Sequence, residues 1–198
     1  MQIFMGKFDP QIHHRHSIRL PNYDYTQAGA YYLTIVTHNR ESLFGEVVDG
    51  EMKLSVFGQI AQREWERLPK RFKPIELGAF VVMPDHVHGI IILHNGRGTA
   101  DFSKQDDLQA PRRAPTNPTT TEWFGKPVPG SIPTIVRSYK SAVSLRLNYA
   151  HPGDSTPVWQ KNYYEHVIRN EKDLQAKWDY IESNPAHWEN DAENPHNA

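Results

Sequence analysis

Residues 81–93 contain two histidines that flank a single valine at the start of an apolar, β-branched run. A run of this length and composition predicts a buried β-strand. Side chains alternate along a strand, so His86 and His88 lie on one face, with backbones roughly 6–7 Å apart. Two imidazoles at this spacing can bind one divalent metal ion. An arbitrary His-x-His pair is more often packed or surface-exposed, so a metal site needs support from other parts of the chain.

The composition is that of one globular domain with an intracellular location. The chain has 198 residues, of which 38% are hydrophobic and none is cysteine. It has no apolar stretch of about 18 residues and no N-terminal secretory signal, so we expect a soluble cytoplasmic protein with no membrane partner. A net charge of −1 excludes a globally basic nucleic-acid binder, but residues 131–150 carry three cations and no acid. A local basic surface is therefore expected.

Hydrophobic periodicity predicts an α+β fold. Apolar runs predict strands at 30–37, 75–83, 86–94 and around 163–168, and spacings of three and four predict helices at 57–68, 132–147 and 171–183. Ser55 and Asn170 are expected N-caps, and Asn184-Pro185 is expected to end the last helix. The order β-α-β-β-α-β predicts a ferredoxin-like antiparallel sheet with helices on one face and an additional C-terminal helix.

Composition also divides the chain into regions. Residues 1–22 form a basic, histidine-rich arm, and residues 23–188 form the domain. Residues 95–130 are rich in Gly, Pro, Thr, Asp and Gln and are expected to be a mobile insertion within that domain. Residues 189–198 are expected to be a flexible tail.

The C-terminal helix supplies candidates for the remainder of a metal site. Tyr180 and Asn184 are four residues apart and therefore share a helical face. The Asn184 amide oxygen can complete the metal site and place Tyr180 beside the same ion, and neutral ligands leave the ion's charge for an anionic phosphodiester. The alternative is structural: Tyr180 packs on the sheet and Asn184 caps the helix before Pro185.

Several separated motifs resemble one known family. They are residues 19–25, 29–34, 44–45, 83–89, 158–166 and 180–185. In this order they resemble the REP-associated tyrosine transposases, single-tyrosine HUH enzymes related to the insertion-sequence transposases that act on single-stranded DNA. The resemblance covers about residues 17–188, apart from the insertion.

The resemblance implies a role for each candidate residue. His86 and His88 match the metal-binding histidines, Tyr180 matches the nucleophilic tyrosine, and Asn184 matches the polar residue that completes the site for Mg²⁺ or Mn²⁺. Related insertion-sequence enzymes commonly have Gln at the position of Asn184. The residue before the first histidine is often Asn, and here it is Asp85, which can alter metal affinity or cap the turn.

The expected function is that of a transposase-like, metal-dependent DNA transesterase. It would cleave and rejoin single-stranded DNA next to a hairpin through a 5′-phosphotyrosine intermediate, acting on the bacterial nucleoid as a monomer or homodimer. The alternatives are a non-catalytic DNA or RNA hairpin-binding regulator that retains the fold, and a small hydrolase with a water nucleophile.

Other residues have candidate roles. The cations expected to contact DNA phosphates are Arg15, Arg19, Arg137, Lys140 and Arg146. Tyr163 and Tyr164 are alternative nucleophiles, although adjacent strand residues point to opposite faces. The histidines of the arm, His13, His14 and His16, are interpreted as part of a phosphate-contacting or solvated segment.

Overall fold

The computed structural model describes residues 23–73, 75–94, 128–150, 156–191 and 194. The predicted N-terminal arm and residues 95–127 of the predicted insertion lie outside the described residues. No described helix is long and apolar enough to cross a membrane.

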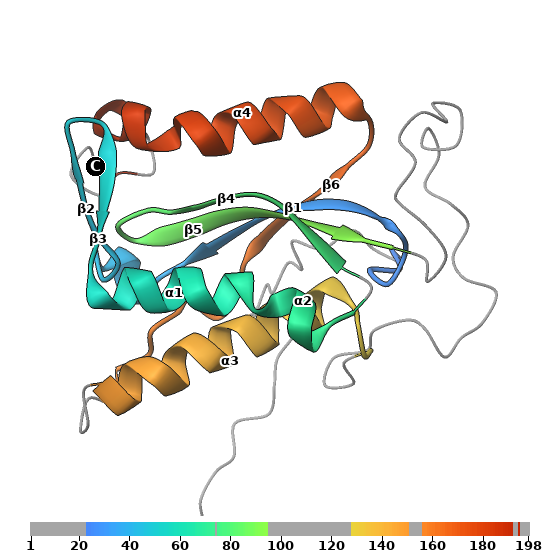
Figure 1. The fold of residues 1–198 in the computed structure, drawn as a ribbon, viewed down its shortest axis with the longest axis horizontal. Coiled ribbons are helices and arrows are strands. Elements are labelled where there is room, and N and C mark those ends of the chain that lie inside the picture. The colour runs from blue at the N-terminus through green and yellow to red at the C-terminus, as the bar shows by residue number, and fades with distance from the viewer. Residues whose placement is uncertain (1–22, 74, 95–127, 151–155, 192–193, 195–198) are drawn as a thin grey trace, which may run out of the picture.

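A four-stranded antiparallel sheet forms the centre of the fold (Figure 1). Its strands are β1 (Gly29–Val36), β4 (Ile75–Val82), β5 (His86–Leu93) and β6 (Tyr164–Ile168), in the order β4-β5-β1-β6. This is the predicted ferredoxin-like topology. In the central pair, Thr34 is opposite His88 and Val36 is opposite His86, so the end of β1 lies beside both histidines.

Helices cover both faces of the sheet, and the two layers are visible in Figure 1. They are α1 (Val56–Glu66), α2 (Leu68–Arg71), α3 (Ile132–Ala150) and α4 (Glu171–His187), with 3₁₀ turns η1 (His38–Arg40) and η2 (Trp188–Asn190). The main core lies between the sheet and α1 and α3, and includes Trp65, Tyr139 and Val87. A smaller cluster, which includes Tyr32, Ile90 and Ile181, lies under α4 on the opposite face.

Individual residues explain where α1 begins and why it can pack closely against the sheet. Ser55 caps it, as predicted, by accepting a hydrogen bond from the Gly58 amide at 3.1 Å. Trp65 lies under Gly89 of β5, where an added Cβ would overlap the indole ring. Pro69 lies in the first turn of α2, where its missing N–H costs no hydrogen bond.

The sequence analysis did not predict the hairpin of β2 (Gly45–Val48) and β3 (Glu51–Leu54). Its strands have only four residues each, too short for a clear period. The turn between them is Asp49-Gly50, and both residues have positive φ, at 54° and 75°. This dipeptide is a strong hairpin signal, so the sequence did contain the information.

The prediction that Asn184-Pro185 ends the last helix was wrong, because α4 continues to His187 and leads into η2. Proline lacks an N–H, but in a last turn this costs a single backbone hydrogen bond. The Trp188 amide donates to the Pro185 carbonyl and closes the helix, and the Trp188 side chain is buried. Asn184 therefore lies within the helix rather than at its C-cap. The start of the expected flexible tail forms η2, and the Asn194 side chain donates to the Trp188 carbonyl at 3.0 Å.

Candidate active site

The two histidines of β5 meet as the alternation of a strand predicts. Both side chains have no exposed surface, and both point to the face covered by α4. Their Nε2 atoms are 2.9 Å apart, with ring centroids at 4.4 Å. The Nε2 atoms of His86 and His88 therefore converge on one point, as the imidazoles of a shared ligand site do.

Asp85 and Arg40 hold the ring of His86. The His86 Nδ1 atom is 2.6 Å from the Asp85 Oδ1 atom, and Arg40 donates to Asp85 Oδ2 at 3.2 Å. The Asp85 carboxylate is fully buried. It favours the tautomer in which His86 Nδ1–H donates a hydrogen bond to it and the Nε2 lone pair faces His88. Arg40 reaches this position from a turn in which Asn39 and Arg40 both have positive φ. An acid–histidine pair of this kind orients metal-bound histidines.

Two hydroxyls from β1 hold the ring of His88. Its Nδ1 atom is 2.8 Å from the Tyr32 hydroxyl and 2.9 Å from the Thr34 hydroxyl, and the Tyr32 ring stacks on the imidazole at 5.5 Å. Burial, with smaller contributions from the charges of His86 and Lys177, lowers the pKa of His88 well below 6.5. The ring is therefore neutral at neutral pH, which is the form that binds metals.

One face of α4, together with the start of η2, covers the histidine pair. The Tyr180 ring lies 5.3 Å from His88, and the Trp188 ring lies 5.6 Å from His86. Asn184 lies one turn from each of these aromatic residues and is 2% exposed. Tyr180 is 37% exposed, so solvent reaches the phenol from outside while the histidines stay buried.

The donor set fits a divalent metal ion. Asn184 Oδ1 is buried and has no hydrogen-bond partner, which is costly unless another group uses this oxygen. Its Nδ2 atom donates to Asp191 at 3.5 Å, so Oδ1 is the atom of the amide that can contact a ligand. Among the described residues, no cluster of three or more His, Cys, Asp or Glu side chains is present. Two neutral imidazoles and one amide oxygen are atoms that can coordinate a divalent metal ion.

Residues that the sequence analysis did not single out also face the site. The Lys177 ammonium lies 5.0 Å from the centre of the Tyr32 ring, three residues before Tyr180 on α4. The only sequence signal for Lys177 is this helical spacing. Arg40 gave no signal, because it contacts a residue 45 positions away.

The alternative nucleophiles, Tyr164 at the start of β6 and Tyr163 immediately before it, point to opposite faces of the sheet, as their adjacency predicts. The Tyr164 ring is 6.4 Å from Tyr32 and half exposed, on the face of the histidines. The Tyr163 ring packs against the main core on the other face. Of these two tyrosines, only Tyr164 faces the site.

The structure does not bring the predicted DNA-contacting cations to this face. Arg137, Lys140 and Arg146 belong to α3, on the opposite side of the sheet. Lys140 donates to the carbonyls of the 160–162 loop, at 2.5 Å to that of Gln160, and burial lowers its pKa to about 8. Arg146 pairs with Glu64 at 2.5 Å, whereas Arg137 is exposed. Arg15 and Arg19 lie outside the described residues.

Comparisons with known proteins agree with the resemblance seen in the sequence. No protein-family model matches the chain. An uncharacterised protein of Haemophilus influenzae is 37% identical over 188 residues, which cover 93% of this chain and 96% of that protein. The REP-associated tyrosine transposase of Escherichia coli is 25% identical over 161 residues, which cover 81% of this chain and 68% of that protein.

A solved structure of a REP-associated tyrosine transposase bound to a REP hairpin has the same fold. It is 20% identical and gives a TM-score of 0.51, with 81% of this chain and 68% of that chain covered. The chain therefore belongs to one family with the uncharacterised protein of Haemophilus influenzae, and the REP-associated tyrosine transposases are among its more distant relatives.

Proposed function

We propose that this protein cleaves and rejoins single-stranded DNA beside a hairpin, with Tyr180 as the nucleophile. The observation that carries the proposal is the position of the partly exposed Tyr180 ring, 5.3 Å from a fully buried pair of converging histidines. Relatedness to the REP-associated tyrosine transposases supports DNA as the substrate, and a protein of the same fold is bound to a REP hairpin.

His86, His88 and Asn184 would hold the metal ion. When bound, Mg²⁺ or Mn²⁺ supplies positive charge that polarises the scissile phosphate and favours the phenolate of Tyr180. Asp85 and Arg40 favour the His86 tautomer with its proton on Nδ1, and Tyr32 and Thr34 hold the ring of His88. The protein therefore fixes both rings before any ligand arrives, as the preorganisation of a site requires.

Tyr180 carries out the covalent step. Its phenolic oxygen, having released its proton to solvent, attacks the phosphorus, and the bond from phosphorus to the 3′-oxygen breaks. The 3′-oxygen takes up a proton from solvent, which leaves a free 3′-OH and a 5′-phosphotyrosine. A 3′-OH that attacks this intermediate reverses the step, joins two strands and releases Tyr180. No ATP is consumed, because the phosphodiester is exchanged for a phosphotyrosyl ester.

Lys177 adds positive charge on the same face of the sheet. Its ammonium packs on Tyr32, which contacts both His88 and Tyr180. A cation in this position attracts the anionic strand and stabilises the phenolate of Tyr180. The residue has no role in bond breaking and acts on binding and on the ionisation of the nucleophile.

An adduct assay tests the proposal. End-labelled single-stranded hairpin DNA is incubated with the protein and Mn²⁺, and denaturing gels detect DNA that is covalently bound to protein. We expect the adduct with the wild-type protein and with Tyr164→Phe, and none with Tyr180→Phe, whose hairpin affinity stays within about threefold of wild type because only one oxygen is lost.

Each contrary result has a separate meaning. Adduct formation by Tyr180→Phe that is lost in Tyr164→Phe would move the nucleophile to β6. Hairpin binding by wild-type protein without any adduct would overturn the catalytic proposal in favour of a non-catalytic hairpin-binding regulator. Cleavage without an adduct would favour the hydrolase.

A further inference from the structure

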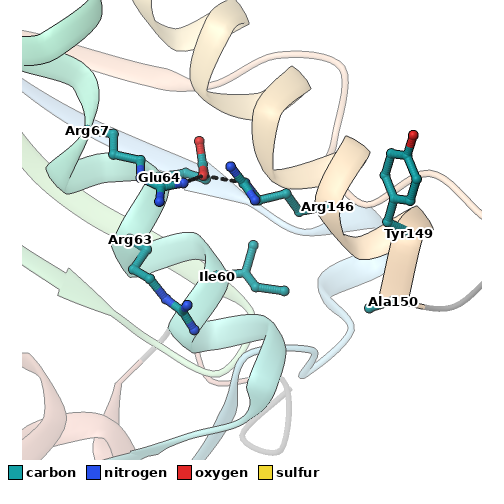
Figure 2. A pocket seen from close by; sticks show the side chains of 7 residues that line it. All are labelled: Ile60, Arg63, Glu64, Arg67, Arg146, Tyr149 and Ala150. Carbon is teal, nitrogen blue, oxygen red and sulfur yellow. Dashed lines mark hydrogen bonds and ion pairs between the residues drawn. The ribbon is translucent and has the colours of Figure 1, made fainter.

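A cleft lies between α1 and α3, on the face of the sheet opposite His86 and His88. Its volume is about 390 Å³. Figure 2 shows the side chains that line it: Ile60, Arg63 and Glu64 from α1, Arg67 between α1 and α2, and Arg146, Tyr149 and Ala150 from the last turns of α3. We call it the α1–α3 cleft. The proposed cleavage reaction uses none of these residues.

A buried carboxylate organises the arginines of the cleft. Glu64 has no exposed surface, and it pairs with Arg67 at 2.8 Å, with Arg146 at 2.5 Å and with Arg71. Burial alone would raise the pKa of Glu64, but hydrogen bonds from Arg71 and Arg67 and the charge of Arg146 bring it below its usual value. Glu64 is therefore ionised and holds guanidinium groups from two helices side by side.

The cleft keeps a large excess of positive charge. Three arginines, Arg63, Arg67 and Arg146, line the cleft, and Glu64 is the one acid among the described residues that line it. The paired arginines stay between 32% and 51% exposed. Arg63 is exposed as well, and its Nε atom donates a 3.4 Å hydrogen bond to the Gln59 carbonyl. Guanidinium donors that are exposed and held in place are suited to bind phosphate oxygens.

An aromatic side chain lies beside these cations. Tyr149 is 79% exposed and stands at the outer end of the cleft, one turn after Arg146 (Figure 2). Tyr149 belongs to neither core cluster of the described residues. An exposed aromatic ring next to a row of arginines is the typical arrangement for binding single-stranded nucleic acid, in which the cations contact the backbone and the ring stacks on an unpaired base.

The geometry points to the α1–α3 cleft as a second DNA-binding site, which takes the backbone of an unpaired stretch of the substrate. Arg63, Arg67 and Arg146 contact its phosphates, and Tyr149 stacks on a base. The inference rests on the proposed function, because that function supplies DNA as the partner. Since the sheet separates the cleft from Tyr180, the cleft acts on DNA affinity and not on bond breaking.

Two exposed side chains permit a test that leaves the Glu64 network intact. Fluorescence anisotropy measures the affinity for a fluorescein-labelled hairpin with a single-stranded extension, at several salt concentrations. We expect Tyr149→Ala to weaken binding about fivefold or more, by loss of base stacking. Arg63→Ala should weaken binding and reduce the slope of log K against log salt by roughly 0.7, the value for one phosphate on a single strand.

Lys70→Ala is the matched control, because Lys70 is an exposed cation on the neighbouring α2 that does not line the cleft. Its affinity should stay within about twofold of wild type. Thermal unfolding of all three variants checks that the fold is intact. Equal losses in Lys70→Ala and Arg63→Ala, or unchanged binding in both Arg63→Ala and Tyr149→Ala, would overturn the inference.

The amount of adduct formed at saturating DNA separates this inference from the proposed function. Arg63→Ala and Tyr149→Ala should form as much adduct as wild type once DNA is saturating, and less when it is limiting. Variants that lose adduct even at saturation would refute a role in binding alone. Absence of adduct in the wild-type protein would contradict the proposed function, while the anisotropy results would still decide whether the cleft binds DNA.

Discussion

Replacing Asp85 with Asn should weaken metal binding without disturbing the fold. The Asp85 carboxylate is fully buried, lies 2.6 Å from His86 Nδ1 and receives a hydrogen bond from Arg40 at 3.2 Å. Asn has the same shape but no charge, so it keeps the acceptor for His86 and loses the ion pair. The hydrogen bond to a carboxylate is roughly twice as strong as one to a neutral oxygen.

The expected increase in the Kd for Mn²⁺ depends on which contacts of Asp85 each substitution keeps. Loss of a partner that orients a metal-bound histidine typically costs 10–100-fold in metal affinity. Asp85→Asn retains one acceptor, so we expect about a tenfold increase in the Kd for Mn²⁺. Asp85→Ala removes both the acceptor for His86 Nδ1 and the carboxylate that Arg40 contacts, so we expect about a hundredfold increase.

Isothermal titration of the DNA-free protein with Mn²⁺ measures these constants directly. The matched control is Asp173→Asn, because Asp173 also pairs with a histidine, His166, at 2.9 Å on the same face of the sheet. The control should bind Mn²⁺ as wild type does. Wild-type affinity in Asp85→Asn and in Asp85→Ala would refute the claim that this carboxylate orients a metal ligand.

Three further predictions concern the histidine pair and its support. His88→Ala should abolish Mn²⁺ binding and adduct formation with an unchanged circular dichroism spectrum, because its partners Tyr32 and Thr34 can bond each other, as their 3.3 Å contact shows; normal cleavage by this variant would exclude the metal site. In the metal-free protein the lowered pKa of His88 means that the unfolded chain takes up a proton near pH 6.5 that the folded chain does not. Stability should therefore fall as the pH drops below 6.5, by at most about 1.4 kcal/mol per unit from this group, and urea unfolding at pH 7.5 and 5.5 should show a smaller fall in His88→Ala. Gly89→Ala should destabilise the fold by about 1–3 kcal/mol, because its methyl group overlaps Trp65; urea unfolding with no loss of stability would show that α1 can shift away.

The sequence predicted the sheet and the facing histidines because strand alternation is a local property. His86 and His88 needed only a correct strand assignment, and Tyr180 and Asn184 needed only a helical spacing of four. The predicted end of α4 was wrong because the tendency of proline to end a helix was given too much weight. Packing of Trp188 on His86 favours the longer helix.

Long-range features were beyond sequence patterns. Arg40 contacts Asp85 across 45 residues, and only the tertiary fold makes this pairing visible. The cations of α3 were correctly placed on a helix, but their sequence pattern gives no information about which side of the sheet that helix covers. The Glu64 network joins α1 to α3, and a buried Glu in a charged helix has the same sequence pattern as an exposed one.

The most direct test of the central claim is to identify the residue that becomes attached to DNA. The covalent complex formed by the wild-type protein with Mn²⁺ and a single-stranded hairpin is digested with protease and nuclease, and mass spectrometry locates the modified tyrosine. The account predicts a nucleotide attached through its 5′-phosphate to Tyr180. Attachment at another tyrosine, or through a 3′-phosphate, would contradict it.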